Sequence, residues 1–339
     1  MRAQLDLSFE VITSLENLLG AWQEFTRGKK QRKDVQEFGF HLMDNLSTLH
    51  DDLVSFHYRH GGYHAFSIAD PKPRSIHKAS VRDRVLHHAV YQVLYPFFDR
   101  MFVPTSFSCR NNKGTHAALQ RFASSARQVS RNHTRTCWVL KLDIVKFFAN
   151  IDHAILSSIL ASSIPDERTR ALLGEVIGSF SSTAPGVGLP LGNLTSQLLV
   201  NVYMNEFDQF VKHALKAKHY IRYADDFVLL SENKTWLEEQ IALVSSFLHT
   251  RLRLRLHPNK IVLATIASGV DFLGWVHFPY HRVLRTATKR RMFRRLIEHP
   301  TEATVQSYLG LISHGETLTL REKVLNTAGL WSGTEEYDS

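Results

Sequence analysis

Three aspartates beside short apolar runs are the residues in this sequence best suited to chemistry. Asp143 lies near the end of the β-rich run at residues 137–144, and Asp225 and Asp226 separate two short apolar runs at residues 219–223 and 227–230. Runs joined by so tight a turn predict a β-hairpin with the acids at its tip. Most Asp-Asp pairs on turns are merely solvated or cap a helix. The strands on both sides and the upstream Asp143 favour a functional cluster instead.

A gathered set of carboxylates implies a bound cation, because neighbouring carboxylates repel one another. Mg²⁺ prefers carboxylate and water oxygens, and it is usually held by one or two carboxylates together with substrate phosphates. Two such ions can stabilise both the attacking and the leaving oxygen of an in-line phosphoryl displacement. The sequence therefore predicts a magnesium site that performs phosphoryl transfer.

The surrounding elements indicate an α+β domain. A helical spacing of apolar residues occurs at residues 1–60, 80–101, 145–160, 194–215, 236–248 and 287–330, and strand candidates lie at residues 65–68 and 269–278. The tight hairpin favours an antiparallel sheet over a doubly wound parallel one. A ferredoxin-like split βαβ arrangement would place Asp143 beside the hairpin tip.

Composition excludes several classes of protein. The chain has 339 residues, of which 44% are hydrophobic and 22% charged, as expected for a globular protein of about two domains. Its two cysteines cannot form a disulfide framework or a four-thiolate zinc site. We find no signal-peptide pattern and no apolar run long enough to span a membrane. We therefore expect a cytoplasmic protein without a membrane partner.

The positive charge is concentrated in one segment. The net charge is +9, and residues 251–300 contain eleven Lys or Arg against two acids, so the remainder of the chain is neutral. This distribution favours a polyanionic partner, nucleic acid before membrane. The alternative is an ordinary solvated basic helix.

Several motifs in order along the chain resemble those of reverse transcriptases. Residues 223–226, Tyr-Ala-Asp-Asp, match the YxDD box, and residues 142–153 resemble the first catalytic motif. Further resemblances, to the fingers, middle, post-YxDD and primer-grip motifs, lie at residues 71–74, 82–85, 188–197, 256–260 and 272–275. The ordered set covers about residues 65–280 and is much more specific than any single box.

The resemblance implies a right-hand polymerase and its organisation. Residues 1–60 would form an N-terminal helical extension, residues 61–280 the fingers and a ferredoxin-like palm, and residues 281–339 a small, basic helical thumb. The implied activity is RNA-directed DNA polymerase, with template RNA, the cDNA or primer and dNTPs as partners. The implied cofactor is a pair of Mg²⁺ ions, for which Mn²⁺ can substitute. The resemblance makes Asp143, Asp225 and Asp226 catalytic metal ligands, helped by the Ile144 carbonyl.

The remaining site residues also come from the resemblance. The implied dNTP-binding residues are Lys72, Arg74, Phe148, Leu191, Gly192, Gln197 and Lys260. The implied primer and template contacts are Tyr223, Gly274, Trp275, Lys289, Arg290, Arg291 and Arg294. Phe148 would block a 2′-hydroxyl, and Lys260 would protonate or steady the pyrophosphate. Plainer alternatives are a solvated turn at residues 71–74, a core aromatic at Phe148 and a loop lysine at Lys260.

One substitution resembles a particular subgroup. Residues 190–192 read Pro-Leu-Gly where most reverse transcriptases carry Pro-Gln-Gly. The sequence resembles the bacterial or phage enzymes of diversity-generating retroelements in this change, in its length and in residues 109–116. Those enzymes copy a template RNA with errors mainly at adenines, together with a small basic accessory protein. Leu191 would loosen fidelity, or it is a packing replacement without that effect.

Three other functions remain open. Defence-linked and group II intron-like bacterial reverse transcriptases share several of these features. A nucleic-acid-binding protein that kept the polymerase shape without catalysis is disfavoured by the presence of all three acids. A palm-fold nucleotidyl cyclase would need neither the basic residues at 72 and 74 nor a basic thumb.

Overall fold

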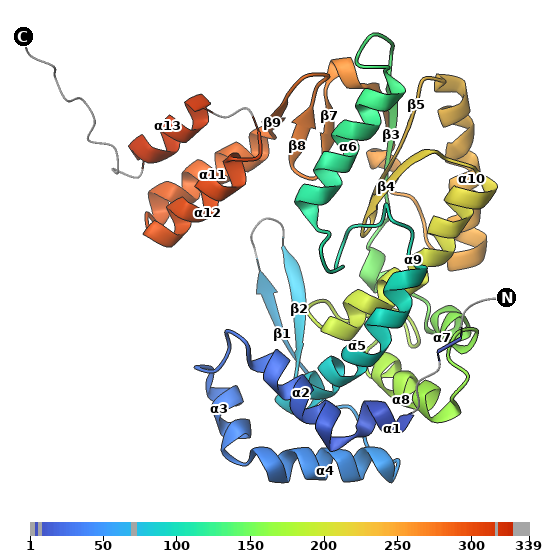
Figure 1. Ribbon diagram of the computed structural model, residues 1–339, viewed down its shortest axis with the longest axis vertical. Helices are drawn as coiled ribbons and strands as arrows, with labels where there is room; N and C mark the ends of the chain where they lie inside the picture. Colours follow the sequence, from blue (N-terminus) through green and yellow to red (C-terminus); the bar gives the residue numbers. More distant parts are fainter. Residues whose placement is uncertain (1–3, 6–8, 69–72, 316–317, 328–339) are drawn as a thin grey trace, which may run out of the picture.

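The centre of the protein is a four-stranded antiparallel sheet in the order β4-β5-β3-β6 (Figure 1). The computed structural model describes residues 4–5, 9–68, 73–315 and 318–327. The four strands are β3 (Trp138–Asp143), β4 (His219–Tyr223), β5 (Asp226–Ser231) and β6 (Val262–Thr265). Helices connect β3 to β4 and β5 to β6, which is the connectivity of a split βαβ unit. The prediction of an α+β fold with an antiparallel sheet is confirmed.

Both faces of this sheet are covered. Leu140 and Leu142 of β3 join a core with α9 (Leu194–Gln209) and α10 (Lys234–Leu252). On the other face, Val139 joins a core with α6 (Thr115–Val129) and β7 (Val270–Phe272). Neighbouring residues of a strand point to opposite faces, so the apolar run of β3 serves both cores. The strands β7, β8 (Trp275–His277) and β9 (Arg282–Leu284) form a second, three-stranded sheet.

The N-terminal part is a layer of helices packed on α5 (Val81–Met101). Its helices are α1 (Phe9–Thr13), α2 (Leu15–Thr26), α3 (Lys33–Phe40) and α4 (Leu42–Val54). Ser14 and Ser80 cap α2 and α5 by accepting a backbone N–H with their side chains, which explains where these helices begin. A two-stranded hairpin of β1 (Tyr63–Ile68) and β2 (Arg74–Ala79) extends from this layer.

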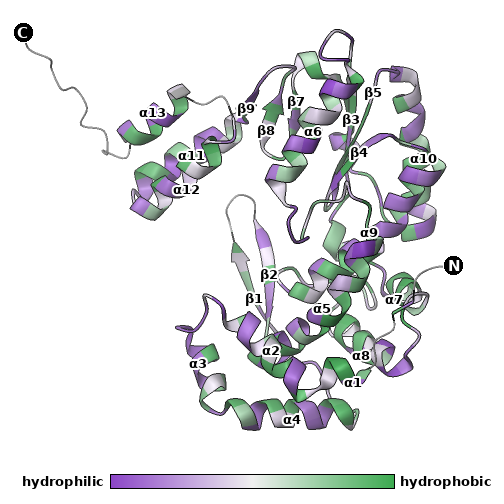
Figure 2. Cartoon of the chain, in the orientation of Figure 1, coloured by the Kyte–Doolittle hydropathy of each residue, from purple (hydrophilic) through white to green (hydrophobic). Residues whose placement is uncertain are grey.

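The C-terminal part is a group of three helices, α11 (Thr286–Glu298), α12 (Glu302–Ile312) and α13 (Leu318–Thr327). They share a small core that contains Met292, Leu296 and Val305. In Figure 1 this group lies on the side where the β1–β2 hairpin projects. Figure 2 shows mixed hydrophobic and hydrophilic residues along the outer helices such as α4 and α10, as expected when only one side of a helix is buried.

The prediction of a single helix at residues 145–160 is wrong. Lys146 adopts a left-handed conformation with φ of 43°, a short 3₁₀ helix follows at Phe147–Asn150, and α7 begins only at His153. The Asp152 carboxylate caps α7 by accepting the Ile155 N–H at 2.9 Å. Asp152 is extended rather than helical, so a single helix cannot run through residues 145–160. A further helix, α8 (Glu167–Gly178), follows α7.

Among the residues that the structure describes, no helix is both long enough and apolar enough to cross a membrane.

Candidate active site

Strand register places two of the three aspartates opposite each other. Asp143 of β3 is the Cα partner of Asp226 of β5. Directly opposed residues of an antiparallel pair have Cβ atoms about 5 Å apart on one face of the sheet. Asp225 lies in the turn that joins β4 to β5, where Ala224 takes a φ of 55°. We call this turn, at residues 224–225, the aspartate turn. The structure therefore brings together the three acids that the sequence analysis singled out.

Burial and mutual repulsion make two of these carboxylates, Asp225 and Asp226, harder to ionise. Burial, with Asp225 and Asp143 nearby, raises the pKa of Asp226 to about 6, although Lys141 at 3.9 Å opposes the shift. Burial and the charge of Asp143 also raise the pKa of Asp225, whereas Lys260 and Arg74 oppose this increase. The cluster is thus short of positive charge, and a further cation would stabilise its ionised form.

Lys260 supplies one positive charge to the cluster. Its Nζ lies 2.8 Å from Oδ2 of Asp143. The 3₁₀ turn Pro258–Lys260 that carries it is attached to β3, because the His257 N–H donates to the Asp143 carbonyl at 2.8 Å. Arg74, on β2, lies within electrostatic reach of Asp225, so the β1–β2 hairpin extends toward the same site.

The three carboxylates are suitable ligands for a hard divalent cation, although they are not already arranged around one. Within the described part of the chain, no group of three or more His, Cys, Asp and Glu side chains forms a ready metal cage. All three side chains at this point are nevertheless carboxylates, the ligands that Mg²⁺ prefers. The Asp143 carbonyl accepts from His257, and the Val145 N–H donates to Arg255. Since successive strand carbonyls alternate in direction, the Ile144 carbonyl points toward the β5 side.

A loop between residues 189 and 193 joins the β1–β2 hairpin to the aspartate region. The His77 N–H donates to the Leu191 carbonyl at 3.0 Å, and the Asn193 side chain donates to the His77 carbonyl at 2.8 Å. On the other side, the Leu189 N–H donates to the Phe148 carbonyl at 2.8 Å. Gly192 is required here, because its φ is 103° and a Cβ would lie 2.7 Å from a methyl of Ile76.

The other predicted nucleotide-binding residues differ in how the structure places them. Phe148 is half-buried and packs edge-on against Phe147, with ring centroids 5.5 Å apart. Leu191, in the loop before α9, and Gln197, in the first turns of that helix, are also half-buried. Lys72 lies outside the described residues.

The predicted primer and template residues fall into two groups. Tyr223 is half-buried beside the aspartate turn, and its hydroxyl accepts from Thr115 at 3.2 Å. Gly274 lies in the β7–β8 turn with φ of 86°. Trp275 is only 2% exposed and packs against Leu119 and Leu284, so its side chain supports this turn from inside. The four basic residues lie on α11 and are exposed or half-buried: Lys289, Arg290, Arg291 and Arg294.

Sequence reasoning missed a buried ion pair behind the aspartate turn. Arg222 and Asp208 are both completely buried and bind each other through two hydrogen bonds, of 2.6 and 2.7 Å. Arg222 also donates to the Ala224 carbonyl at 3.2 Å. The signal that could have revealed this pair is an arginine inside the apolar run at residues 219–223.

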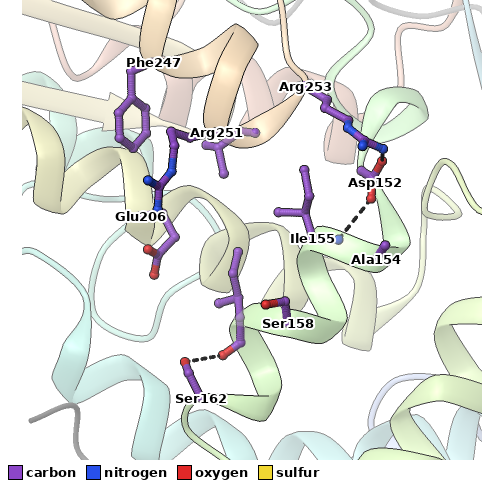
Figure 3. A pocket seen from close by; sticks show the side chains of 11 residues that line it. Asp152, Ala154, Ile155, Ser158, Ser162, Glu206, Phe247, Arg251 and Arg253 are labelled. Atoms are coloured by element: carbon purple, nitrogen blue, oxygen red, sulfur yellow. Dashed lines mark hydrogen bonds and ion pairs between the residues drawn. The ribbon is translucent and has the colours of Figure 1, made fainter.

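A separate pocket lies between α7, α9 and the C-terminal end of α10, as Figure 3 shows. Its volume is about 440 Å³. Asp152, from the first catalytic motif of the sequence analysis, lies at its edge and pairs with Arg253 at 2.6 Å. Asp152 therefore connects α7 to the end of α10 and is not a member of the aspartate cluster.

Comparison with known proteins identifies the family. Residues 69–277 match the family model described as reverse transcriptase (RNA-dependent DNA polymerase). The chain is 26% identical over 302 residues to protein YkfC of Escherichia coli, covering 77% of each protein. It is 23% identical over 292 residues to the group II intron-encoded protein LtrA of Lactococcus lactis, covering 65% of this chain and 46% of LtrA. The matched segment includes the aspartate cluster, so the chain belongs to the reverse transcriptase family and is an RNA-directed DNA polymerase.

Proposed function

We propose that this chain copies a template RNA into cDNA by two-metal-ion nucleotidyl transfer at Asp143, Asp225 and Asp226. The observation that carries the proposal is the pairing of Asp143 with Asp226 across β3 and β5, with Asp225 in the adjoining turn. Two bound Mg²⁺ ions, or Mn²⁺ in their place, would neutralise the carboxylates and polarise the reacting phosphate oxygens. The Ile144 carbonyl would complete the ligand set.

The remaining residues would position the nucleotide. Arg74 and Lys72 would contact the triphosphate, since the metal ions offset only part of its charge. Phe148 would limit space at the sugar 2′ position, and Leu191, Gly192 and Gln197 would line the nascent base pair. Lys260, which pairs with Asp143 here, would turn to the leaving pyrophosphate.

The parts of the chain would then have the roles expected of a right-hand polymerase. We assign residues 61–280 to the fingers and palm, residues 1–60 to an N-terminal extension and residues 281–339 to the thumb. Lys289, Arg290, Arg291 and Arg294 on α11 would follow the phosphates of the primer–template duplex. Tyr223 and the Gly274 turn would support the primer end, with Trp275 behind the turn.

For the biological role we propose error-prone cDNA synthesis in a diversity-generating retroelement, with a small basic accessory protein as partner. Leu191 in place of the usual glutamine supports this role. The second candidate is a group II intron-like enzyme, which the likeness to LtrA favours. A defence-linked role is a further alternative. Single-nucleotide incorporation opposite each template base separates the first role from the others: errors concentrated at adenine support diversification.

The test of catalysis is primer extension on poly(rA)/oligo(dT) with Mg²⁺. We expect incorporation by the wild type and none by Asp143→Asn or Asp225→Asn, while nucleic-acid affinity changes by no more than a few-fold. Asp44→Asn, at an exposed position of α4, is the matched control and should extend normally. The proposal would be contradicted if an active-site variant retained a tenth of the wild-type extension. It would also be contradicted if the wild type incorporated no nucleotide.

A further inference from the structure

A cavity beside β4 contains polar groups whose hydrogen-bonding capacity is unused. It has a volume of about 460 Å³ and lies between residues 104–107 and the outer face of α6. Thr105 and Arg121 line it, and the Thr105 hydroxyl and Nε of Arg121 are buried without a hydrogen-bond partner. Buried polar groups are nearly always paired, so these two groups retain the capacity to hydrogen-bond a ligand near the cavity.

The charges around the cavity specify the kind of ligand. Lys113 lines the wall together with Arg121 and donates to the Pro104 carbonyl at 2.9 Å, which leaves two of its three N–H groups for a ligand. Lys212 and His219 lie within electrostatic reach of Arg121. His219 also has a buried Nδ1 without a partner. Burial, and then the charges of Arg121 and Lys212, lower the pKa of His219, as expected in a region of excess positive potential.

Nearby acids do not remove this excess of positive charge. Asp99 influences Lys113, but its carboxylate binds Arg110 at 2.6 Å. Asp208 is fully engaged by Arg222 and Tyr220. Hydrogen-bond donors and positive charge around an open cavity match an oxyanion.

We propose that this cavity binds a phosphate group, with Arg121 and Thr105 donating hydrogen bonds and Lys113 adding charge. Its place in the fold connects it to the rest of the palm sheet: the Arg222 N–H donates to the Thr105 carbonyl, and the Phe107 N–H donates to the Arg222 carbonyl, both at 3.0 Å. The cavity thus adjoins β4, the strand that leads to the aspartate turn. The phosphate comes either from the backbone of a nucleic-acid strand or from free phosphate in solution.

Inorganic phosphate is the first probe, titrated calorimetrically into the full-length, Mg²⁺-free protein against chloride at matched ionic strength. Arg121→Gln and Thr105→Val should each weaken phosphate binding by roughly tenfold, because each removes a donor to a charged group. Arg127→Gln is the matched control: Arg127 also lies on α6, but its Nε donates to Asn132 outside the cavity. Lys113→Gln is a third cavity variant, chosen because Lys113 is only half-buried.

The second probe is a single-stranded RNA oligonucleotide, followed by fluorescence anisotropy. If the cavity holds a backbone phosphate, Arg121→Gln weakens RNA binding and inorganic phosphate competes for the wild type but not for the variant. If it holds free phosphate, the variants lose phosphate binding while RNA affinity is unchanged. Failure of the wild type to bind phosphate, or equal binding by the wild type and all three cavity variants, would overturn the proposal. Neither readout depends on polymerase activity.

Discussion

Arg222 and Asp208 form an ion pair in which neither side chain is exposed to solvent. The pair connects the end of α9 to β4, and two further bonds extend it: the Tyr220 hydroxyl donates to Asp208 at 2.6 Å, and Arg222 donates to Ser106 at 2.9 Å. Through its bond to the Ala224 carbonyl, Arg222 also supports the left-handed residue of the aspartate turn. The conformation of the turn thus depends on a charge held behind it.

Breaking this ion pair should markedly destabilise the folded protein. Asp208→Asn leaves the Arg222 guanidinium buried without its counter-ion, which should lower the free energy of unfolding by about 3–5 kcal/mol. Glu238→Gln, which breaks the partly exposed Lys234–Glu238 pair on α10, should cost no more than about 1 kcal/mol. Urea denaturation of both variants checks the difference. Similar costs for the two would show that the buried pair contributes no more than a surface pair.

Lys260 pairs with Asp143, so it should compete with a metal ion for that carboxylate. Lys260→Gln should therefore tighten Mn²⁺ binding about two- to fivefold without nucleotide, a modest gain because the lysine is partly exposed. The same variant should slow primer extension if the lysine also assists the pyrophosphate. Electron paramagnetic resonance of free Mn²⁺ measures the affinity, and Lys234→Gln is the surface control. Unchanged or weaker Mn²⁺ binding would exclude competition.

Stability should depend on pH through a buried histidine in α5. Nε2 of His87 lies 3.1 Å from Nε2 of His60, whose Nδ1 donates to the Gly61 carbonyl at 2.6 Å. Burial, with His60 nearby, lowers the pKa of His87 to about 3, so His87 is neutral in the folded protein near pH 7. An unfolded histidine titrates near pH 6.5, so below that pH the unfolded chain binds the extra proton.

The consequence is a loss of stability on acidification. The contribution of neutral His87 is complete above about pH 6.5 and falls by up to about 1.4 kcal/mol per pH unit between there and its folded pKa. The stability difference between wild type and His87→Gln should therefore be smaller at about pH 5 than at about pH 7. Urea midpoints measure it, with exposed His57→Gln as the control. A difference independent of pH would mean that the pKa of His87 is the same in the folded and the unfolded chain.

Local sequence patterns were sufficient to predict the elements that carry part of the site. The β4–β5 hairpin was predictable because two apolar runs flank a tight turn, and α5 because its apolar residues recur at helical spacing. In contrast, β2 has exposed and half-buried residues over most of its length and depends on pairing with β1, so no apolar pattern marks it. The partnership of Arg222 with Asp208 joins a strand to a helix, and only tertiary packing creates it. For the same reason, the unpaired groups at Thr105 and Arg121 could not be predicted.

The basic face of α11 should bind nucleic-acid phosphates. Changing the two exposed residues Arg290 and Arg294 to glutamine should weaken primer–template binding and reduce the slope of log affinity against log salt by roughly one unit for each lost contact. Fluorescence anisotropy at several salt concentrations measures the slope. Arg135→Gln, which breaks an exposed pair with Glu232, is the control. If the slope of log affinity against log salt is the same for the α11 variant and the wild type, α11 does not contact the nucleic-acid phosphates.

The last prediction concerns fidelity at residue 191. The Leu191 backbone is fixed by the bond from His77 to its carbonyl, and its side chain is half-buried, so a glutamine can replace it without rebuilding the loop. At the nucleotide site proposed above, a glutamine amide would donate and accept hydrogen bonds beside the nascent base pair, whereas leucine offers only shape. One such contact is worth on the order of 1 kcal/mol, or several-fold in selectivity.

Leu191→Gln should therefore lower misincorporation, most visibly opposite template adenine. The measurement is the ratio of incorporation rates for correct and incorrect dNTPs opposite each of the four bases on an RNA template. Leu243→Gln, the same substitution at an exposed position of α10, controls for the change in polarity. Equal error rates in Leu191→Gln and the wild type at every base would make Leu191 a packing residue. The source of any infidelity would then have to lie among the other residues around the nascent pair, with Phe148 and Gln197 as the next to change.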